Sequence, residues 1–201
     1  MTTRSRPLTL AAIILTTSLV GSGCSSSADG PRERPTSASE SPSPTAEPSS
    51  PSVPSDWQTV ALTHVAEISV PSDWTVKSTG DALDTLQAPK DKVGFPPGAA
   101  TINVGNLAGG DEKKQLEWMA NRQLKTDYAN YHPKRLPNEV INGTTFYRLQ
   151  FENESDLYDV YGTVTPDGEY GIVVEWKFMK TVNRKQAEAI WSPVMPTFKM
   201  L

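Results

Sequence analysis

The strongest constraint on the fold is a run of alternating apolar and polar residues between residue 144 and residue 178, divided by short turn sequences. Alternation with a period of two indicates strands that bury one face. An Asn-Gly pair at 142–143 precedes the run and is the preferred sequence for a tight hairpin turn, and Pro-Asp-Gly at 166–168 turns the chain again. We predict an antiparallel meander with one buried face, formed by strands over 145–151, 158–164 and 170–178.

A shorter stretch at 67–77 predicts a hairpin near the start of the folded region. Ile68 and Val70 alternate with polar residues, and Pro71, which lacks a backbone donor, ends this strand. Ser and Asp then supply a turn, and Trp74 opens the next strand with a ring large enough to anchor it to the core. We expect the sheet and helices to be built around this hairpin.

Two helices are expected. The first extends from Asp111, a suitable capping residue, to Ala129, and its apolar stripe belongs to the core. This stripe consists of Leu116, Met119, Ala120, Leu124 and Tyr128. The second helix covers 184–191 and stops before Pro193, after which the tail 194–201 packs along the domain. The remaining strands are predicted over 60–70, 85–88 and 100–104.

The first 23 residues have the layout of a bacterial lipoprotein signal peptide. Arg4 and Arg6 form a basic region, residues 8–20 form an apolar run too short to span a bilayer, and small residues lead to Cys24. The pattern departs from the usual lipobox at Gly21, where Leu is commonest. Cys24 is the only cysteine, so we predict that its thiol is acylated and anchors the protein to the extracytoplasmic face of the cell membrane. The alternative is a soluble secreted protein with one free thiol.

Residues 24–55 comprise this cysteine and a predicted disordered tether. The segment 25–55 contains 11 Ser and 7 Pro in 31 residues, and Val53 is its only aliphatic residue larger than Ala. Such a segment cannot bury enough apolar surface to offset its ordering entropy. The remaining residues, 56–201, suffice for a single domain with its own core.

Charge and motif content exclude several classes of function. The formal net charge is −4 and the folded region has no cluster of Lys or Arg, which argues against a nucleic-acid partner and against electrostatic docking on anionic lipid. No Gly-x-Ser-x-Gly nucleophile motif occurs, and His64 and His132 stand without a motif around them. We therefore predict a protein that is not an enzyme, with no catalytic residues and no cofactor.

A calcium site is the alternative raised by a group of acidic residues near the link between two strands. The group consists of Glu152, Glu154, Asp156 and Asp159. Its spacing is not that of an EF-hand, and acidic hairpin loops are usually only solvated, so we predict no metal.

A site for an apolar ligand or partner is the remaining class. Most of the five tryptophans must fill the core, but some aromatic rings could line a groove between helix and sheet, where ligand sites often form. The residues predicted to contact a ligand or partner are Phe95, Pro96, Pro97, Trp118 and Tyr131.

The order of these features resembles that of the actinobacterial LpqN/LpqT lipoproteins, part of a wider group that shares the fold of Ran-binding Mog proteins and the photosystem protein PsbP. The resemblance is carried by the lipobox, the tether, the sequence Ile-Ser-Val-Pro-Ser-Asp-Trp at 68–74, and the strand plus helix at 170–198. It covers the mature domain. It implies an α+β fold, an α/β/α sandwich with a central antiparallel sheet, and a non-enzymatic accessory role in the cell envelope.

Two functions are expected from these observations. The first is a membrane-anchored module that binds a lipid or glycolipid. The second is a protein–protein adaptor for an envelope transport or assembly system, with no small-molecule ligand. A continuous cavity in the folded domain would favour the first, and a shallow exposed patch would favour the second.

Overall fold

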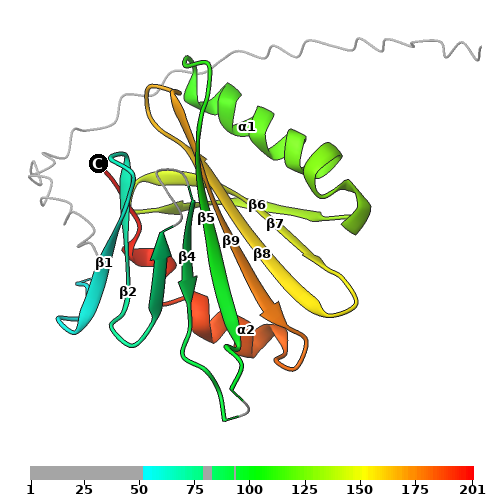
Figure 1. Cartoon of the computed structure of the whole chain (residues 1–201). Coiled ribbons are helices and arrows are strands. Elements are labelled where there is room, and N and C mark those ends of the chain that lie inside the picture. The colour runs from blue at the N-terminus through cyan, green and yellow to red at the C-terminus, as the bar shows by residue number, and fades with distance from the viewer. Residues whose placement is uncertain (1–51, 79–82, 93) are drawn as a thin grey trace, which may run out of the picture. The chain divides into compact units, whose positions relative to one another are not determined.

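The computed structural model describes residues 52–78, 83–92 and 94–201, which form two antiparallel sheets and two α-helices (Figure 1). The strands are β1 (Trp57–Leu62), β2 (Ala66–Pro71), β3 (Thr75–Ser78), β4 (Leu83–Gln87), β5 (Gly98–Asn106), β6 (Lys134–Ile141), β7 (Thr144–Glu152), β8 (Asp156–Val164), β9 (Tyr170–Met179) and β10 (Lys199–Met200). The α-helices are α1 (Glu112–Arg122) and α2 (Arg184–Trp191). Shorter helical turns are η1 (Gln123–Asp127, π), η2 (Ala129–Tyr131, 3₁₀) and η3 (Met195–Thr197, 3₁₀).

The larger sheet has the strand order β3-β4-β5-β9-β8-β7-β6, and the smaller sheet has the order β1-β2-β10. The predicted meander is present in the larger sheet. Its first turn has a positive φ at both Asn142 (48°) and Gly143 (80°), as a type I′ hairpin requires. The Asn142 side chain also donates hydrogen bonds to the carbonyl oxygens of Pro196 (2.6 Å) and Phe198 (3.0 Å). These bonds attach the C-terminal tail to the hairpin, as expected for a tail that packs along the domain.

α1 and α2 pack on opposite faces of the larger sheet. Adjacent residues of a strand point to opposite faces, and on β7 Tyr147 packs in the cluster that contains α1, whereas Phe146 packs in the cluster that contains α2. The smaller sheet lies on the same side as α2. The α+β class and the sandwich around a central antiparallel sheet are therefore confirmed, with a three-stranded sheet added to one outer layer.

The hairpin predicted at 67–77 is wrong in its pairing. β2 pairs with β1 and β10, whereas β3 pairs with β4 in the other sheet. The turn closed by the Trp74 N–H and the Pro71 carbonyl (3.0 Å) therefore carries the chain from one sheet to the other. Alternation identifies a strand but not its partner. Trp74 does anchor this corner, because its buried ring lies edge-on to Trp176 with 6.0 Å between centroids.

Three further predictions need correction. Residues 60–70 belong to two strands, because Thr63 adopts a φ of 53° and turns the chain between β1 and β2. The meander is buried on both faces, since Phe146 and Tyr147 both lie under a helix layer and are both fully buried. The first predicted helix is α-helical only to Arg122 and then continues as the turns η1 and η2.

The remaining helix predictions are confirmed. Asp111 caps α1 by accepting a hydrogen bond from the Lys114 N–H at 2.8 Å, and Leu116, Met119 and Ala120 are buried against the sheet. α2 has the predicted bounds. The predicted signal peptide, the cysteine predicted to be acylated and the predicted tether up to residue 51 lie outside the described residues. Neither helix of the described region is long and apolar enough to cross a bilayer.

Candidate functional site

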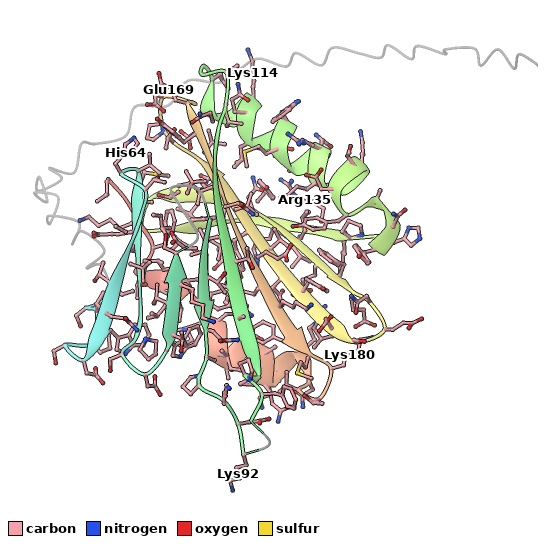
Figure 2. All side chains as sticks on the ribbon, in the orientation of Figure 1. His64, Lys92, Lys114, Arg135, Glu169 and Lys180 are labelled. Atoms are coloured by element: carbon pink, nitrogen blue, oxygen red, sulfur yellow. The ribbon has the colours of Figure 1, made fainter. Side chains whose placement is uncertain are left out.

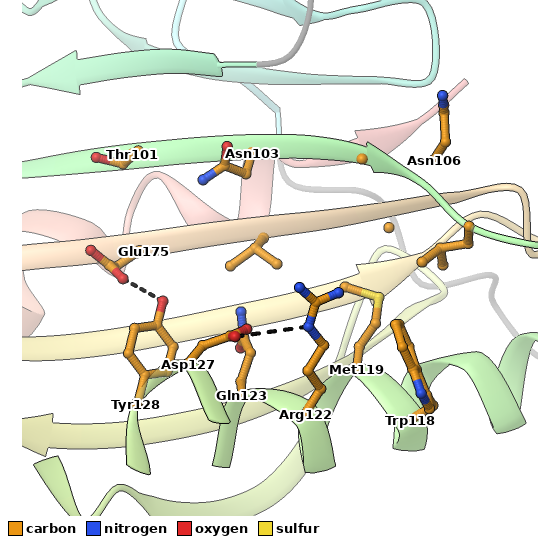
Figure 3. A pocket seen from close by; sticks show the side chains of 14 residues that line it. Thr101, Asn103, Asn106, Trp118, Met119, Arg122, Gln123, Asp127, Tyr128 and Glu175 are labelled. Carbon is orange, nitrogen blue, oxygen red and sulfur yellow. Dashed lines mark hydrogen bonds and ion pairs between the residues drawn. The ribbon is translucent and has the colours of Figure 1, made fainter. Parts of the chain in front are cut away.

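α1 covers only part of the sheet face on which it packs. Its main strand contacts are with β7 and β8, and the neighbouring strands β9 and β5 continue the same face beyond the helix. Between α1 and these two strands lies a cavity of about 390 Å³, here termed the helix–sheet cavity (Figure 3). It is lined by Thr101, Asn103, Gly105, Asn106, Leu107, Trp118, Met119, Arg122, Gln123, Asp127, Tyr128, Gly171, Val173 and Glu175.

The cavity is open because its floor lacks two side chains. Gly105 on β5 and Gly171 on β9 are paired across the sheet and both line the cavity. A Cβ atom on Gly171 would lie 2.6 Å from the Met119 sulfur, so this glycine lets α1 approach β9. A Cβ atom on Gly105 would meet no atom within 4 Å. Gly171 therefore allows α1 to pack close to the sheet, and Gly105 leaves the space above the sheet empty.

The end of the cavity near η1 is polar. The Tyr128 hydroxyl donates a short hydrogen bond to the Glu175 carboxylate. The Arg122 Nε lies 3.8 Å from the Asp127 carboxylate, and both side chains are exposed enough for this ion pair to be loose. The cavity thus offers a cation and two carboxylates for hydrogen bonds to a polar ligand (Figure 3).

Burial keeps the tyrosines near this end protonated. Desolvation raises the pKa of Tyr128 far above its ordinary value, and the negative charge of Glu175 raises it further. Burial also raises the pKa of Tyr147, although the nearby Arg135 opposes the shift. The Tyr147 hydroxyl donates to the side-chain oxygen of the buried Gln123 at 2.8 Å. Both tyrosines therefore act as neutral donors that hold Glu175 and Gln123 in place.

The opposite end of the cavity, where Asn106 also lies, is mostly apolar. It is formed by Leu107, Trp118 and Met119. The Trp118 side chain is 50% exposed, which leaves much of a large ring available for contact. The Arg122 guanidinium lies over this ring, 5.6 Å from its centroid, and restrains its orientation. An exposed aromatic ring next to hydrogen-bonding groups suits an amphipathic ligand.

Trp118 is the one residue among the five predicted contacts that lines the helix–sheet cavity. Tyr131 lies beyond η1, where its ring stacks on Phe151 at 5.5 Å and on Tyr158 at 6.4 Å between centroids. The structure therefore does not bring Tyr131 to Trp118.

The other three predicted contacts, Phe95, Pro96 and Pro97, lie in the loop before β5. They line a separate cavity of about 270 Å³ together with Lys177 and Met179. Figure 2 marks this end of the domain with the labels Lys92 and Lys180, and the opposite end, where α1 begins, with Lys114. Phe95 is 57% exposed, as predicted for a residue that contacts a partner.

Sequence analysis missed most of the cavity. Gly105, Gly171 and Glu175 come together only because β5 pairs with β9, two strands far apart in the sequence. One signal was available, since a glycine inside or next to a predicted strand marks a place where another backbone or a ligand approaches closely. Both glycines meet that description.

Three of the four acidic residues that raised the calcium alternative are paired with cations. Their ion pairs are Asp156 with Lys177 (3.2 Å), Glu152 with Lys180 (3.4 Å) and Asp159 with Arg184 (2.9 Å). Within the part of the chain that the structure describes, no group of three or more His, Cys, Asp or Glu side chains is placed to hold a metal ion.

Comparison with known proteins gives no family for this chain. No protein-family model and no curated protein matches it. A protein of Bacteroides thetaiotaomicron VPI-5482, solved at 1.50 Å resolution, is similar over 68% of this chain with 16% sequence identity and a TM-score of 0.42. The match covers 45% of that protein, so this chain spans less than half of its length. The resemblance to the LpqN/LpqT lipoproteins stays a prediction.

Proposed function

We propose that the protein is a lipid-anchored module of the cell envelope that binds the headgroup of a glycolipid in the helix–sheet cavity and carries out no reaction on it. The observation that carries this proposal is the cavity itself. Its volume of about 390 Å³ falls within the range of roughly 300–1,000 Å³ that is typical of small-molecule sites. Its lining combines an exposed aromatic ring with convergent polar groups.

The lining favours a sugar over a purely apolar ligand. Thr101, Asn103 and Glu175 place a hydroxyl, an amide and a carboxylate on the floor, and Arg122 adds a cation from α1. Sugar hydroxyls both donate and accept, so they match a mixture of this kind. The Trp118 ring provides a flat apolar surface for the C–H face of a sugar. A small cavity with a polar floor suits a headgroup better than a pair of acyl chains.

The membrane location is proposed from Cys24. Each buried methylene of an acyl chain contributes about 0.8 kcal/mol to membrane binding, so two or more chains on one cysteine give stable anchoring. A tether rich in Ser and Pro would let the domain reach ligands away from its own anchor.

The test uses the mature chain, residues 24–201, with Cys24→Ser so that no covalent acyl chain is present. After incubation with a glycolipid-containing envelope extract, native mass spectrometry should show a retained mass that corresponds to a glycolipid. A protein that emerges without any added mass would contradict the proposal.

A second candidate function, the protein–protein adaptor, is favoured by a different observation. Phe95 and Met179 are both exposed and flank the separate cavity near Lys177. Exposed apolar groups of this kind mark contact sites. If Phe95→Asp abolished the capture of an envelope transport protein without lowering the melting temperature, and the wild type retained no glycolipid, the adaptor function would replace the first.

A further inference from the structure

A second cavity, of about 470 Å³, adjoins the helix–sheet cavity at Trp118 and is here termed the chain groove. The two cavities share Asn106, Leu107 and Trp118. The chain groove adds Ala108 and side chains from the first turns of α1. The helix–sheet cavity and the chain groove therefore lie next to each other, with the Trp118 ring as a shared wall.

The surface of the chain groove is mostly apolar, although Asn106 also lines it. Leu107 and the Trp118 ring supply apolar surface, and the Gln115 amide already donates a hydrogen bond to the Gly109 carbonyl at 3.0 Å. The methylene groups of Gln115 can therefore contact an apolar ligand in the groove. Lys114, the single charged lining residue, is exposed at the end of the domain (Figure 2). Its ammonium group can reach water while its stem stays along the groove.

Most polar groups of the helix–sheet cavity lie away from the chain groove; the exceptions are Asn106, which lines both, and Arg122, whose guanidinium lies over Trp118. Figure 3 shows Glu175 and Tyr128 at one end of the cavity and Trp118 with Asn106 at the other. A ligand that occupied both the helix–sheet cavity and the chain groove would thus pass from the charged and hydrogen-bonding groups near Glu175, over the Trp118 ring, to the aliphatic side chains of Leu107 and Ala108. This change in polarity along one path matches an amphiphile with a single chain.

We propose that a glycolipid binds in one orientation, with its sugar near Arg122 and Glu175 and the first methylenes of its alkyl chain over Trp118 in the chain groove. This inference rests on the proposed function and specifies its ligand class as an amphiphile rather than a free sugar. A fully buried methylene tightens binding about four-fold, and a half-open groove buries about half of that surface, which corresponds to about two-fold per methylene.

The experiment is isothermal titration of methyl, hexyl and octyl glucoside, each below its micelle concentration, into the mature chain with Cys24→Ser. Trp118→Ala and Ala108→Asp alter the chain groove, and Phe95→Ala is the control because it removes a similarly exposed aromatic ring at the other end of the domain. We expect the wild type and Phe95→Ala to gain about two-fold in affinity per added methylene. Ala108→Asp should bind methyl glucoside like the wild type but lose most of this increment. Trp118→Ala should lose the increment and also bind methyl glucoside more weakly, because the Trp118 ring lines the sugar site as well.

The remaining outcomes separate the inference from the proposed function. Equal affinity of the wild type for all three glucosides would overturn the orientation and leave headgroup binding intact. If the gain in affinity per methylene survives in Ala108→Asp but disappears in Phe95→Ala, the alkyl chain lies in the cavity beside Phe95. This result would also overturn the inference. If none of the three glucosides binds, both the inference and the proposed headgroup site fail.

Discussion

Gly105 and Gly171 are paired across β5 and β9, yet their missing side chains have different consequences. At Gly171 a side chain would collide with Met119, a residue of α1 that is buried against the sheet. At Gly105 it would enter open space in the helix–sheet cavity. The same substitution at two neighbouring positions therefore distinguishes helix packing from ligand access.

We expect Gly171→Leu to lower the free energy of unfolding by about 1–3 kcal/mol, because Met119 must leave its rotamer to make room. Gly105→Leu should change this energy by less than about 0.5 kcal/mol, since the new side chain meets no atom and the position does not need a positive φ. Urea unfolding of both variants measures the difference. Equal decreases in the free energy of unfolding for Gly171→Leu and Gly105→Leu would show that the cavity floor at Gly105 is not open.

The Arg184–Asp159 pair predicts a second stability effect. Asp159 is only 2% exposed, and the Arg184 guanidinium binds its carboxylate at 2.9 Å as well as the carbonyl oxygen of Phe151 at 2.9 Å. Arg184→Met would leave a buried carboxylate without its cation, which costs about 3 kcal/mol, the lower end of the usual range because Arg184 is itself partly exposed. Lys180→Met, which breaks the exposed pair with Glu152, is the control and should cost less than about 1 kcal/mol.

The same pair predicts a pH dependence. Burial raises the pKa of Asp159 above its ordinary value, although Gln150 and Arg184 oppose the shift. A carboxyl group with a raised pKa in the folded state favours folding most at low pH, and this contribution is lost as pH rises through the folded pKa. The penalty of Arg184→Met should therefore be smaller near pH 4 than near pH 7. A penalty that grows on acidification would contradict the assignment of the buried charge.

The buried tyrosines predict a loss of stability in alkali. Desolvation raises the pKa of Tyr128, Tyr147 and Tyr161 well above the ordinary value of 10.0. Their contribution to folding is complete below about pH 10 and is lost as pH rises above it, because only the unfolded chain ionises there. Tyrosinate absorbance near pH 11 should be lower for the folded protein than for the protein in denaturant. Tyr147→Phe should reduce the absorbance of the denatured form alone.

The membrane location has its own test. Cys24→Ser should move the full-length protein from the detergent phase to the aqueous phase in a phase-partition experiment, because acyl chains on this thiol are the proposed anchor. Unchanged partition into detergent would show that something other than Cys24 holds the protein at the membrane.

Local signals in the sequence predicted local structure well. The Asn-Gly pair at 142–143 and the bounds of α2 are confirmed because a type I′ turn and a capped helix depend on neighbouring residues. Asn183 caps α2 in a reciprocal arrangement with Gln186, a short-range interaction of this kind. Trp118 was likewise identified because a large aromatic residue near a helix surface is visible without knowledge of its neighbours.

Pairing between distant segments could not be predicted in the same way. The alternation before Pro71 showed a strand but not that its partners are β1 and β10. The cavity floor depends on the register that sets Gly105 opposite Gly171 and Thr101 opposite Glu175. A single sequence contains no direct record of that register, so neither the floor nor the role of Glu175 was predicted.

The most direct test of the central claim is titration calorimetry of octyl glucoside with Gly105→Leu, in the mature chain carrying Cys24→Ser. A leucine at this position should fill the helix–sheet cavity and weaken binding at least about ten-fold, equivalent to about 1.4 kcal/mol, without loss of fold. Thr75→Leu, at an exposed position of β3 outside the cavity lining, should bind like the wild type. If Gly105→Leu binds octyl glucoside as tightly as the wild type, the ligand does not occupy this cavity and the account is contradicted.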